Sequence, residues 1–312
     1  MSADLKHGTT STGLPTPATA ELVHKLDPSQ VLLTDWRTGS ADVHHVTAVL
    51  PDDHPIYRGR HGGLDPMLVV EAYRQSILLL GHTAYGTPLG DHQAWMQFGA
   101  AFDPAGLATG PGPTTVELRM AASDIVRRAG RPAAATMRAQ ITAGGRAVAS
   151  ATTQFTNQSL AVYSRLRGAY ADVERAMAHA IPLPPPLSSA RAARAGFRDV
   201  VLSATDSATR HQLRVDPTHP GLFDHPVDHA PGMLLLEAIR QSSFAHLADA
   251  QADLVALQCT FSRYCELDAP CWMQSTRLPD AGNGDARFSV TAVQHGRCIL
   301  TAAVDLRPRP AA

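Results

Sequence analysis

Two ten-residue segments of this chain carry the same three polar residues at the same spacing. Residues 67–76 read MLVVEAYRQS and residues 233–242 read MLLLEAIRQS, an offset of 237 − 71 = 166 positions in a chain of 312 residues. The shared polar residues are Glu71, Arg74 and Gln75 in the first segment and Glu237, Arg240 and Gln241 in the second. At positions i, i+3 and i+4 of an α-helix, these side chains share one face. The other positions are mostly apolar, so the segments predict two buried helices.

A carboxylate within a buried helix has two interpretations. Burial without a partner is costly and an arginine stands at i+3, so a structural Glu–Arg pair is one of them. The other is a functional carboxylate, favoured because the set occurs twice and because the preceding loops are rich in acid–base groups. The first loop holds His54, Tyr57, Arg58, Arg60, His61 and Asp65. The second loop, residues 219–232, holds His219, Asp224, His225, Asp228 and His229.

The spacing of His225 and His229 introduces a metal site as a further alternative. Two histidines four residues apart bind zinc together when they lie on one helix, but Pro226 and Pro231 disfavour a helix there. The four cysteines form no C-x-x-C pair and give no zinc signature. We therefore expect no metal and no cofactor.

Composition narrows the classes of function. The chain is 44% hydrophobic and 18% charged, which suits packed cores rather than disorder. Its formal net charge of −1 gives no general attraction to nucleic acid or to an acidic membrane surface. There is no run of about 18 apolar residues and no basic-then-apolar start. We expect no membrane span and a cytoplasmic protein.

Hydrophobic periodicity predicts an α+β fold built from two similar units. Helices are expected over residues 66–85 and 231–248, with Asp65 as N-cap and Pro66 in the first turn of the former. Alternation predicts strands in the first half at residues 31–36, 44–50, 95–102, 114–126, 133–142 and 146–156. In the second half the predicted strands are 200–203, 209–215, 257–265, 287–294 and 297–306. An amphipathic helix over residues 163–177 and a proline-rich linker join the halves.

The same pattern sets the expected domain boundaries. They are a mobile tail at 1–20, a first repeat at 21–157, a helical connector with linker at 158–195 and a second repeat at 196–312. The duplication extends beyond the helices, since residues 96–98 match 257–259 and residues 145–151 match 296–302 in pattern. We expect the repeats to pack face to face as a pseudo-symmetric pair.

The loop and helix of the second repeat resemble those of the hotdog-fold β-hydroxyacyl-carrier-protein dehydratases. In that fold an antiparallel sheet wraps a long helix, and acyl thioesters bind between two paired units. Over nearly the whole chain, the sequence resembles more closely the AfsA family of tandem-hotdog γ-butyrolactone biosynthesis proteins. The segments that carry this resemblance are VLLTDW (31–36), LDP (64–66), EAYRQ (71–75), HP (219–220), FDHPVDH (223–229), PGM (231–233) and EAIRQ (237–241).

This resemblance implies two tandem hotdog repeats packed as an internal pseudo-dimer, and an acyltransferase. A β-ketoacyl chain would pass from acyl carrier protein to the hydroxyl of dihydroxyacetone phosphate, and the ester would later cyclise toward a butenolide, a γ-butyrolactone or a furan signal. Acyl carrier protein and dihydroxyacetone phosphate are the expected partners, and the chain is expected to be a monomer or a homodimer. The alternatives are a hotdog thioesterase or dehydratase acting on acyl thioesters, and a non-catalytic acyl-ligand-binding protein.

Roles for single residues follow from the resemblance and from their chemistry. The two glutamates are candidate bases for the attacking hydroxyl. We predict Glu237 with Arg240 as the catalytic pair, because the second loop keeps the fuller set of His, Asp and Pro-Gly, and Glu71 as its support or as a second site. Backbone N–H groups at the helix starts, near Gly232-Met233 and Pro66-Met67, are predicted to bind an oxyanion. Phosphate binding is predicted for the arginines with histidine assistance, namely Arg74, Arg240, His225 and His229.

Overall fold

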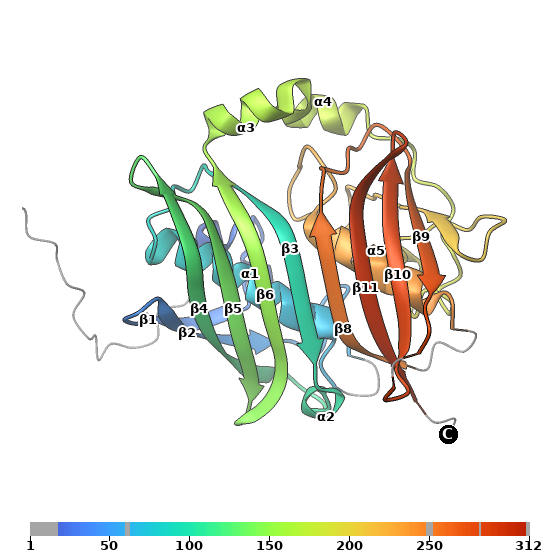
Figure 1. The fold of residues 1–312 in the computed structure, drawn as a ribbon, viewed down its shortest axis with the longest axis horizontal. Coiled ribbons are helices and arrows are strands. Elements are labelled where there is room, and N and C mark those ends of the chain that lie inside the picture. The colour runs from blue at the N-terminus through green and yellow to red at the C-terminus, as the bar shows by residue number, and fades with distance from the viewer. Residues whose placement is uncertain (1–17, 60–62, 248–251, 281, 310–312) are drawn as a thin grey trace, which may run out of the picture.

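The structure is a computed structural model that describes residues 18–59, 63–247, 252–280 and 282–309. Most of the expected tail, the loop residues Arg60 and His61, and the expected helix end at Ala248 lie outside the described residues. Each half of the chain places one long helix against an antiparallel sheet (Figure 1). The α+β class and the tandem hotdog repeats are confirmed.

The first half supplies six strands and the longer helix. Its elements are β1 (Leu33–Thr38), β2 (Val43–Leu50), α1 (Pro66–Thr83), β3 (His92–Phe102), α2 (Pro104–Leu107), β4 (Thr114–Arg128), β5 (Arg131–Ala143) and β6 (Arg146–Gln158). The second half contains β7 (Arg210–Gln212), α5 (Gly232–Phe244), β8 (Ala252–Phe261), β9 (Cys271–Arg277), β10 (Ala286–Gln294) and β11 (Arg297–Pro308). Buried and outward positions alternate along these strands, because successive side chains point to opposite faces.

The two repeats join edge to edge. Strand β3 pairs antiparallel with β8, with Phe98 opposite Cys259, and the strands form one sheet in the order β1-β2-β4-β5-β6-β3-β8-β11-β10-β9-β7. Phe98 and Cys259 are equivalent positions of the duplication, so the pseudo-twofold axis passes between them. The expected face-to-face packing is therefore wrong. Edge pairing satisfies backbone N–H and C=O groups that two separate sheets would leave open.

The two long helices begin differently. Helix α1 starts as predicted, since Pro66 is its first residue and Asp65 accepts the N–H of Met67 at 2.8 Å. Helix α5 starts at Gly232 after Pro231, and no side chain of the described residues caps it. Both helices lie behind the sheet, one in each repeat (Figure 1). Within the described ranges, the chain has no helix that is long and apolar enough to cross a membrane.

The connector is broken rather than one continuous helix. Helix α3 (Leu160–Arg167) ends at Gly168, a 3-10 turn covers Gly168–Ala171, and α4 (Val173–Ala178) follows. Gly168 has φ = 56° and ψ = −128°, a conformation that costs a residue without Cβ little. Both helices arch over one end of the sheet, from the first repeat to the second (Figure 1).

Three other strand predictions need correction. Residues 200–203 form isolated bridges only, because Val201 N–H donates to the side chain of Gln241 rather than to a strand. Strand β7 covers three residues instead of 209–215, and β8 lies at Ala252–Phe261 rather than 257–265. Strand β9 is not predicted at all. Its buried positions include the polar Ser275, which hides the apolar alternation.

Candidate active site

A large cavity lies where the two repeats meet. Its volume is about 1050 Å³, and its wall combines α1 and the start of β3 with the second-repeat loop and the residues around the end of β8. Six of the eight predicted site residues line it, namely Glu71, Arg74, His225, His229, Gly232 and Met233. Glu237 and Arg240 are not among its lining residues. The wall of the cavity is therefore formed by the helix of the first repeat together with the loop of the second.

Glu71 binds three side chains at the cavity wall. Nε and Nη2 of Arg74 each lie 2.7 Å from one of its carboxylate oxygens, which makes a bidentate pair. Lys25 Nζ lies 3.3 Å from this carboxylate, and Gln75 donates to it at 3.0 Å. Burial raises the pKa of Glu71, but the charges of Arg74 and Lys25 outweigh burial and hold that pKa well below its usual value. Glu71 is an anion at neutral pH, and its low pKa makes it a weak base.

Arg74 and Lys25 together form what we call the cationic wall of the cavity. Both side chains line the cavity. The Arg74 side chain is 21% exposed, against 5% for Glu71. The two cations share Glu71 as a partner, and part of the Arg74 side chain stays accessible. This arrangement suits the binding of a small anion from the cavity side.

Each cavity histidine of the second-repeat loop stands beside an aspartate. Nδ1 of His229 lies 2.6 Å from Asp228 Oδ1, a short hydrogen bond. Nδ1 of His225 lies 3.4 Å from Asp224, which is long for such a bond. Asp224 instead accepts the backbone N–H groups of residues 26 and 27 and so ties the second-repeat loop to the first repeat. Within the described ranges, no group of three or more His, Cys, Asp or Glu is placed to hold a metal ion.

The start of α5 belongs to the same cavity. Gly232 and Met233 line it, and the first N–H groups of the helix lack a side-chain cap among the described residues. Uncapped N–H groups and the helix dipole together favour a negative charge at this position. A thioester oxygen that gains charge during acyl transfer is such a group. At α1 the equivalent N–H is already taken by Asp65.

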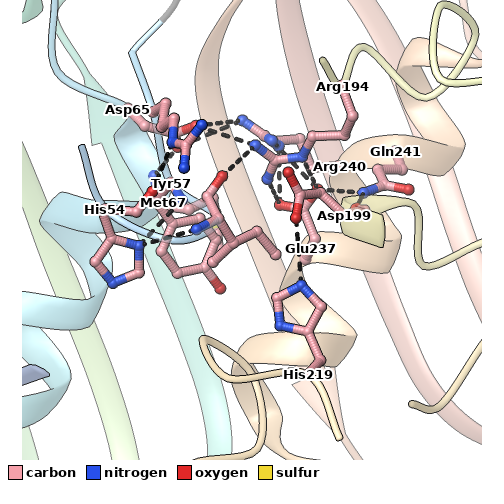
Figure 2. Close-up of polar contacts among 12 residues, drawn as sticks. His54, Tyr57, Asp65, Met67, Arg194, Asp199, His219, Glu237, Arg240 and Gln241 are labelled. Atoms are coloured by element: carbon pink, nitrogen blue, oxygen red, sulfur yellow. Dashed lines mark hydrogen bonds and ion pairs between the residues drawn. The ribbon is translucent and has the colours of Figure 1, made fainter. Parts of the chain in front are cut away.

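The second glutamate lies in a closed ion-pair network (Figure 2). Glu237 is fully buried, and Arg194 contacts it at 2.9 and 2.6 Å through Nε and Nη2. Arg240 contacts it at 3.1 and 3.2 Å through Nε and Nη2. Both arginines also reach Asp65, at 3.5 Å from Arg194 and 3.2 Å from Arg240. Two cations and two carboxylates thus balance, and the network links α5 to the N-cap of α1.

The two clusters are structural equivalents. Gln75 binds the backbone of Gln30 and Leu32, and Gln241 binds the backbone of Asp199 and Val201 in the same way. The anchor residues Gln30 and Asp199 are 199 − 30 = 169 positions apart. Lys25 and Arg194 have the same separation, 194 − 25 = 169, and so occupy corresponding places in the two repeats. Sequence reasoning missed both cations. The available signal is a cation six residues before VLL (31–33) and before VVL (200–202).

Two further loop histidines, His54 and His219, point into the protein rather than into the large cavity. His54 is buried, and its Nδ1 accepts the N–H groups of Ile56 and Tyr57. Burial lowers the pKa of His54 to about 4, so this ring is neutral. His219 is buried too and contacts Asp199 at 3.3 Å, as Figure 2 shows. Neither histidine lines the large cavity.

Two solved structures with this fold are similar in architecture and distant in sequence. A putative oleoyl thioesterase from Lactobacillus plantarum matches with a TM-score of 0.53 and 14% identity, over 88% of this chain and 99% of that one. An acyl-ACP thioesterase from Bacteroides thetaiotaomicron matches with a TM-score of 0.53 and 7% identity, over 87% of this chain and all of its own (100%). At such identities the likeness shows the fold alone.

Sequence relatives are much closer. A 2-oxo-3-(phosphooxy)propyl 3-oxoalkanoate synthase from Streptomyces virginiae is 38% identical over 288 residues, 92% of this chain and 96% of the relative. A protein of the same name from Streptomyces coelicolor is 37% identical over 93% of this chain and 90% of its own. The family model described as the A-factor biosynthesis hotdog domain matches residues 7–159 and 179–309. Both repeats are covered, and the chain belongs to this family, AfsA.

Proposed function

We propose that this protein is an acyltransferase that moves a β-ketoacyl chain from acyl carrier protein to the hydroxyl of dihydroxyacetone phosphate. The names of the relatives describe the product as an ester of these two components. The observation that carries the proposal for this chain is the cavity, which brings the cationic wall and the uncapped start of α5 together. We place the reaction in the cytoplasm.

The cationic wall supports a phosphate-bearing acceptor. A guanidinium offers a planar pair of donors that matches two phosphate oxygens, and an ammonium adds a point charge. Glu71 holds the Arg74 guanidinium by two bonds of 2.7 Å and thereby fixes its orientation. We assign Glu71 to positioning Arg74, since its lowered pKa makes it a poor proton acceptor.

The start of α5 supports the acyl donor. When the acceptor oxygen attacks the thioester carbonyl, negative charge develops on the carbonyl oxygen, and the N–H groups near Gly232 and Met233 are placed to stabilise it. The same cavity is lined by apolar side chains, among them Leu78, Leu235 and Phe261, which suit an acyl chain. The prediction that Glu237 is the base stays a prediction, and its full burial outside the cavity lining argues for another role.

The proposal is tested by incubating the protein with β-ketoacyl–acyl carrier protein and dihydroxyacetone phosphate and analysing the products by mass spectrometry. We expect a phosphorylated ester and free carrier thiol. Replacing the acceptor by dihydroxyacetone should abolish ester formation, because the cationic wall then has no phosphate to bind. Free acid released at the same rate with and without acceptor would identify a thioesterase, and an enoyl product would identify a dehydratase.

Arg74→Ala is the matching variant, and we expect it to raise KM for dihydroxyacetone phosphate by at least 10-fold, with Arg74→Lys in between. Arg277→Ala is the control, since that side chain is 50% exposed on the far strand β9. Equal KM values for Arg74→Ala and for the control would contradict phosphate binding at this wall.

A further inference from the structure

We propose that Asp228 and His229 form the proton-transfer dyad of this cavity, and that helix α3 of the connector positions it. This inference rests on the proposed acyl transfer and names the group that takes the proton from the acceptor hydroxyl. It assigns a role to Tyr163 and Arg167, two connector residues that lie outside the cavity lining.

The dyad geometry is that of an oriented base. His229 lines the cavity with a side chain that is 28% exposed, and its Nδ1 lies 2.6 Å from Asp228 Oδ1. A carboxylate at Nδ1 keeps the proton on that nitrogen and leaves the lone pair on Nε2. Among the described residues, Nδ1 is the ring atom that is hydrogen-bonded. Nε2 therefore remains able to accept a proton from a bound hydroxyl.

Two residues of helix α3 bind the Asp228 carboxylate at Oδ2. The Tyr163 hydroxyl donates to Asp228 Oδ2 at 2.5 Å, and Arg167 Nε lies 3.4 Å from the same oxygen. Arg167 is fixed in turn by a bidentate pair with Glu266, at 2.5 and 2.8 Å. Burial raises the pKa of Asp228, but the bonds from His229 and Tyr163 and the charge of Arg167 lower it to about 2. Asp228 thus stays an anion, with Oδ1 bound to His229 and Oδ2 bound to Tyr163 and Arg167.

Glu71, Glu237 and His225 suit the task less well. Glu71 is occupied by Arg74 and Lys25 at the cavity wall. Glu237 lies outside the cavity lining. The aspartate beside His225 lies at the longer distance of 3.4 Å, and that ring is more exposed, at 39%.

The first repeat has no counterpart of the dyad. At the helix offset of 166 residues, the positions equivalent to Asp228 and His229 are Gly62 and Gly63, which carry no proton-accepting side chain. The connector helix occurs once, between the repeats. The dyad therefore belongs to the second repeat, at the cavity that also holds the cationic wall.

The proposed step conserves atoms and charge. Nε2 of His229 takes the hydroxyl proton while the acceptor oxygen bonds to the thioester carbonyl carbon, and the carbonyl oxygen becomes an oxyanion at the start of α5. The C–S bond then breaks, and the leaving thiolate takes the proton back from Nε2. The products are the ester and the carrier thiol, with no oxidant, reductant or net proton involved.

The test compares His229→Gln with the wild type in the ester-forming assay. We expect kcat to fall on the order of 10²-fold or more, KM for dihydroxyacetone phosphate to stay within about 3-fold, and Tm to be retained. His45→Gln, an exposed histidine of β2, is the matched control and should keep full activity. His229→Ala should regain part of its rate when imidazole is added, which a purely structural residue would not show.

Wild-type kcat/KM should fall at acid pH, and this acid limb of the profile should vanish in His229→Gln. The titratable and charged groups around the dyad are Asp228, Tyr163 and Arg167, together with His92 of β3 and Tyr264 and Glu266 after β8. Tyr163→Phe should lower kcat about 10-fold and move the limb, while Tyr170→Phe on the neighbouring exposed turn should do neither.

The outcomes separate this inference from the proposed function. If the wild type forms no ester, the acyl transfer itself is wrong. If the wild type forms ester and His229→Gln keeps kcat within about 3-fold, or raises KM for dihydroxyacetone phosphate at unchanged kcat, the dyad is wrong and His229 is a substrate ligand. Should His229→Gln fail to fold, Asp228→Asn with the same kcat and pH readout decides between these results.

Discussion

The Glu71 and Glu237 clusters have the same helix residues and different surroundings. Glu71 lies at the wall of a cavity of about 1050 Å³ and is bound by Arg74 and Lys25. Glu237 is fully buried and balanced by two arginines, which a second carboxylate, Asp65, also binds. The difference teaches that a Glu-x-x-Arg-Gln motif sets local pairing only. Whether it faces a ligand depends on what the other repeat brings to it.

Asp65 makes this difference concrete. It caps α1 through the Met67 N–H and also binds Arg240, so the start of α1 is closed by protein. The equivalent position before α5 is Pro231, which has no side-chain cap to offer. One helix start is therefore used for cohesion between the repeats, and the other is left open to the cavity.

The largest expected effect is on stability, in Glu237→Gln. Its removal leaves Arg194 and Arg240 buried with one carboxylate between them, and we expect a loss of about 3–5 kcal/mol in the free energy of unfolding. Chemical denaturation measures this. Glu71→Gln is the matched variant, and we expect a smaller loss of stability with a larger loss of activity at native conditions. Equal stability losses in the two variants would break the comparison between the clusters.

Asp65→Ser separates the two functions of the aspartate. Serine keeps the N-cap but removes the charge that binds the two arginines, so we expect a loss of about 2–3 kcal/mol. Asp65→Ala should lose about 1 kcal/mol more, because it also removes the cap. Thermal and urea unfolding provide the measurement. A serine variant as stable as the wild type would mean that the Glu237 network does not need its second carboxylate.

Replacing each of the two equivalent cations by the other kind of cation tests the comparison further. Arg194→Lys keeps the charge but loses the forked contacts to Glu237 and to the carbonyl of Ile56, and should cost about 1 kcal/mol. Lys25→Arg should leave stability almost unchanged and alter KM for the acceptor, since Lys25 lines the cavity. Urea denaturation and measurement of KM for the acceptor, made on both variants, distinguish the two roles. A stability loss in Lys25→Arg alone would reverse the roles assigned to the clusters.

The smallest expected effect is on acid stability. The folded pKa of Glu71 lies below its ordinary value of 4.5, so its contribution to stability is complete above that value and is lost as pH falls through the folded pKa. Glu71→Gln should therefore reduce the difference in stability between pH 7 and pH 3. Urea denaturation midpoints at a series of pH values measure this. A variant with the full acid dependence of the wild type would show that other carboxylates account for it.

Much of the fold was predictable from local patterns. Helix α1 follows from its apolar run and from the Asp65-Pro66 start, and most strands follow from period-two alternation. Strand β9 was not predicted because the polar Ser275 occupies a buried position. The connector was predicted as one helix, but α3 ends at Gly168. Both exceptions arise where a tertiary contact or one backbone conformation overrides a statistical pattern.

The candidate site was predictable in part, for a similar reason. Six of the eight predicted residues line one cavity, since the motif and its loop carry the polar chemistry. Lys25 and Arg194 lie 71 − 25 = 46 and 237 − 194 = 43 residues before their glutamates, so no helical or strand spacing relates them to the motif. Tyr163 was seen as part of an amphipathic helix, and its bond to Asp228 spans 65 residues.

By itself, the sequence determined that the chain is duplicated and that each half holds a Glu-x-x-Arg-Gln helix, because periodicity, capping and the repeat are local properties of the chain. The hotdog fold was implied by the resemblance to the AfsA family. Only the tertiary structure decided which cluster meets the cavity. Ion pairs depend on distance in space and on burial, not on separation along the chain. Asp65 and Arg194 close one cluster, and the second-repeat loop opens a cavity beside the other.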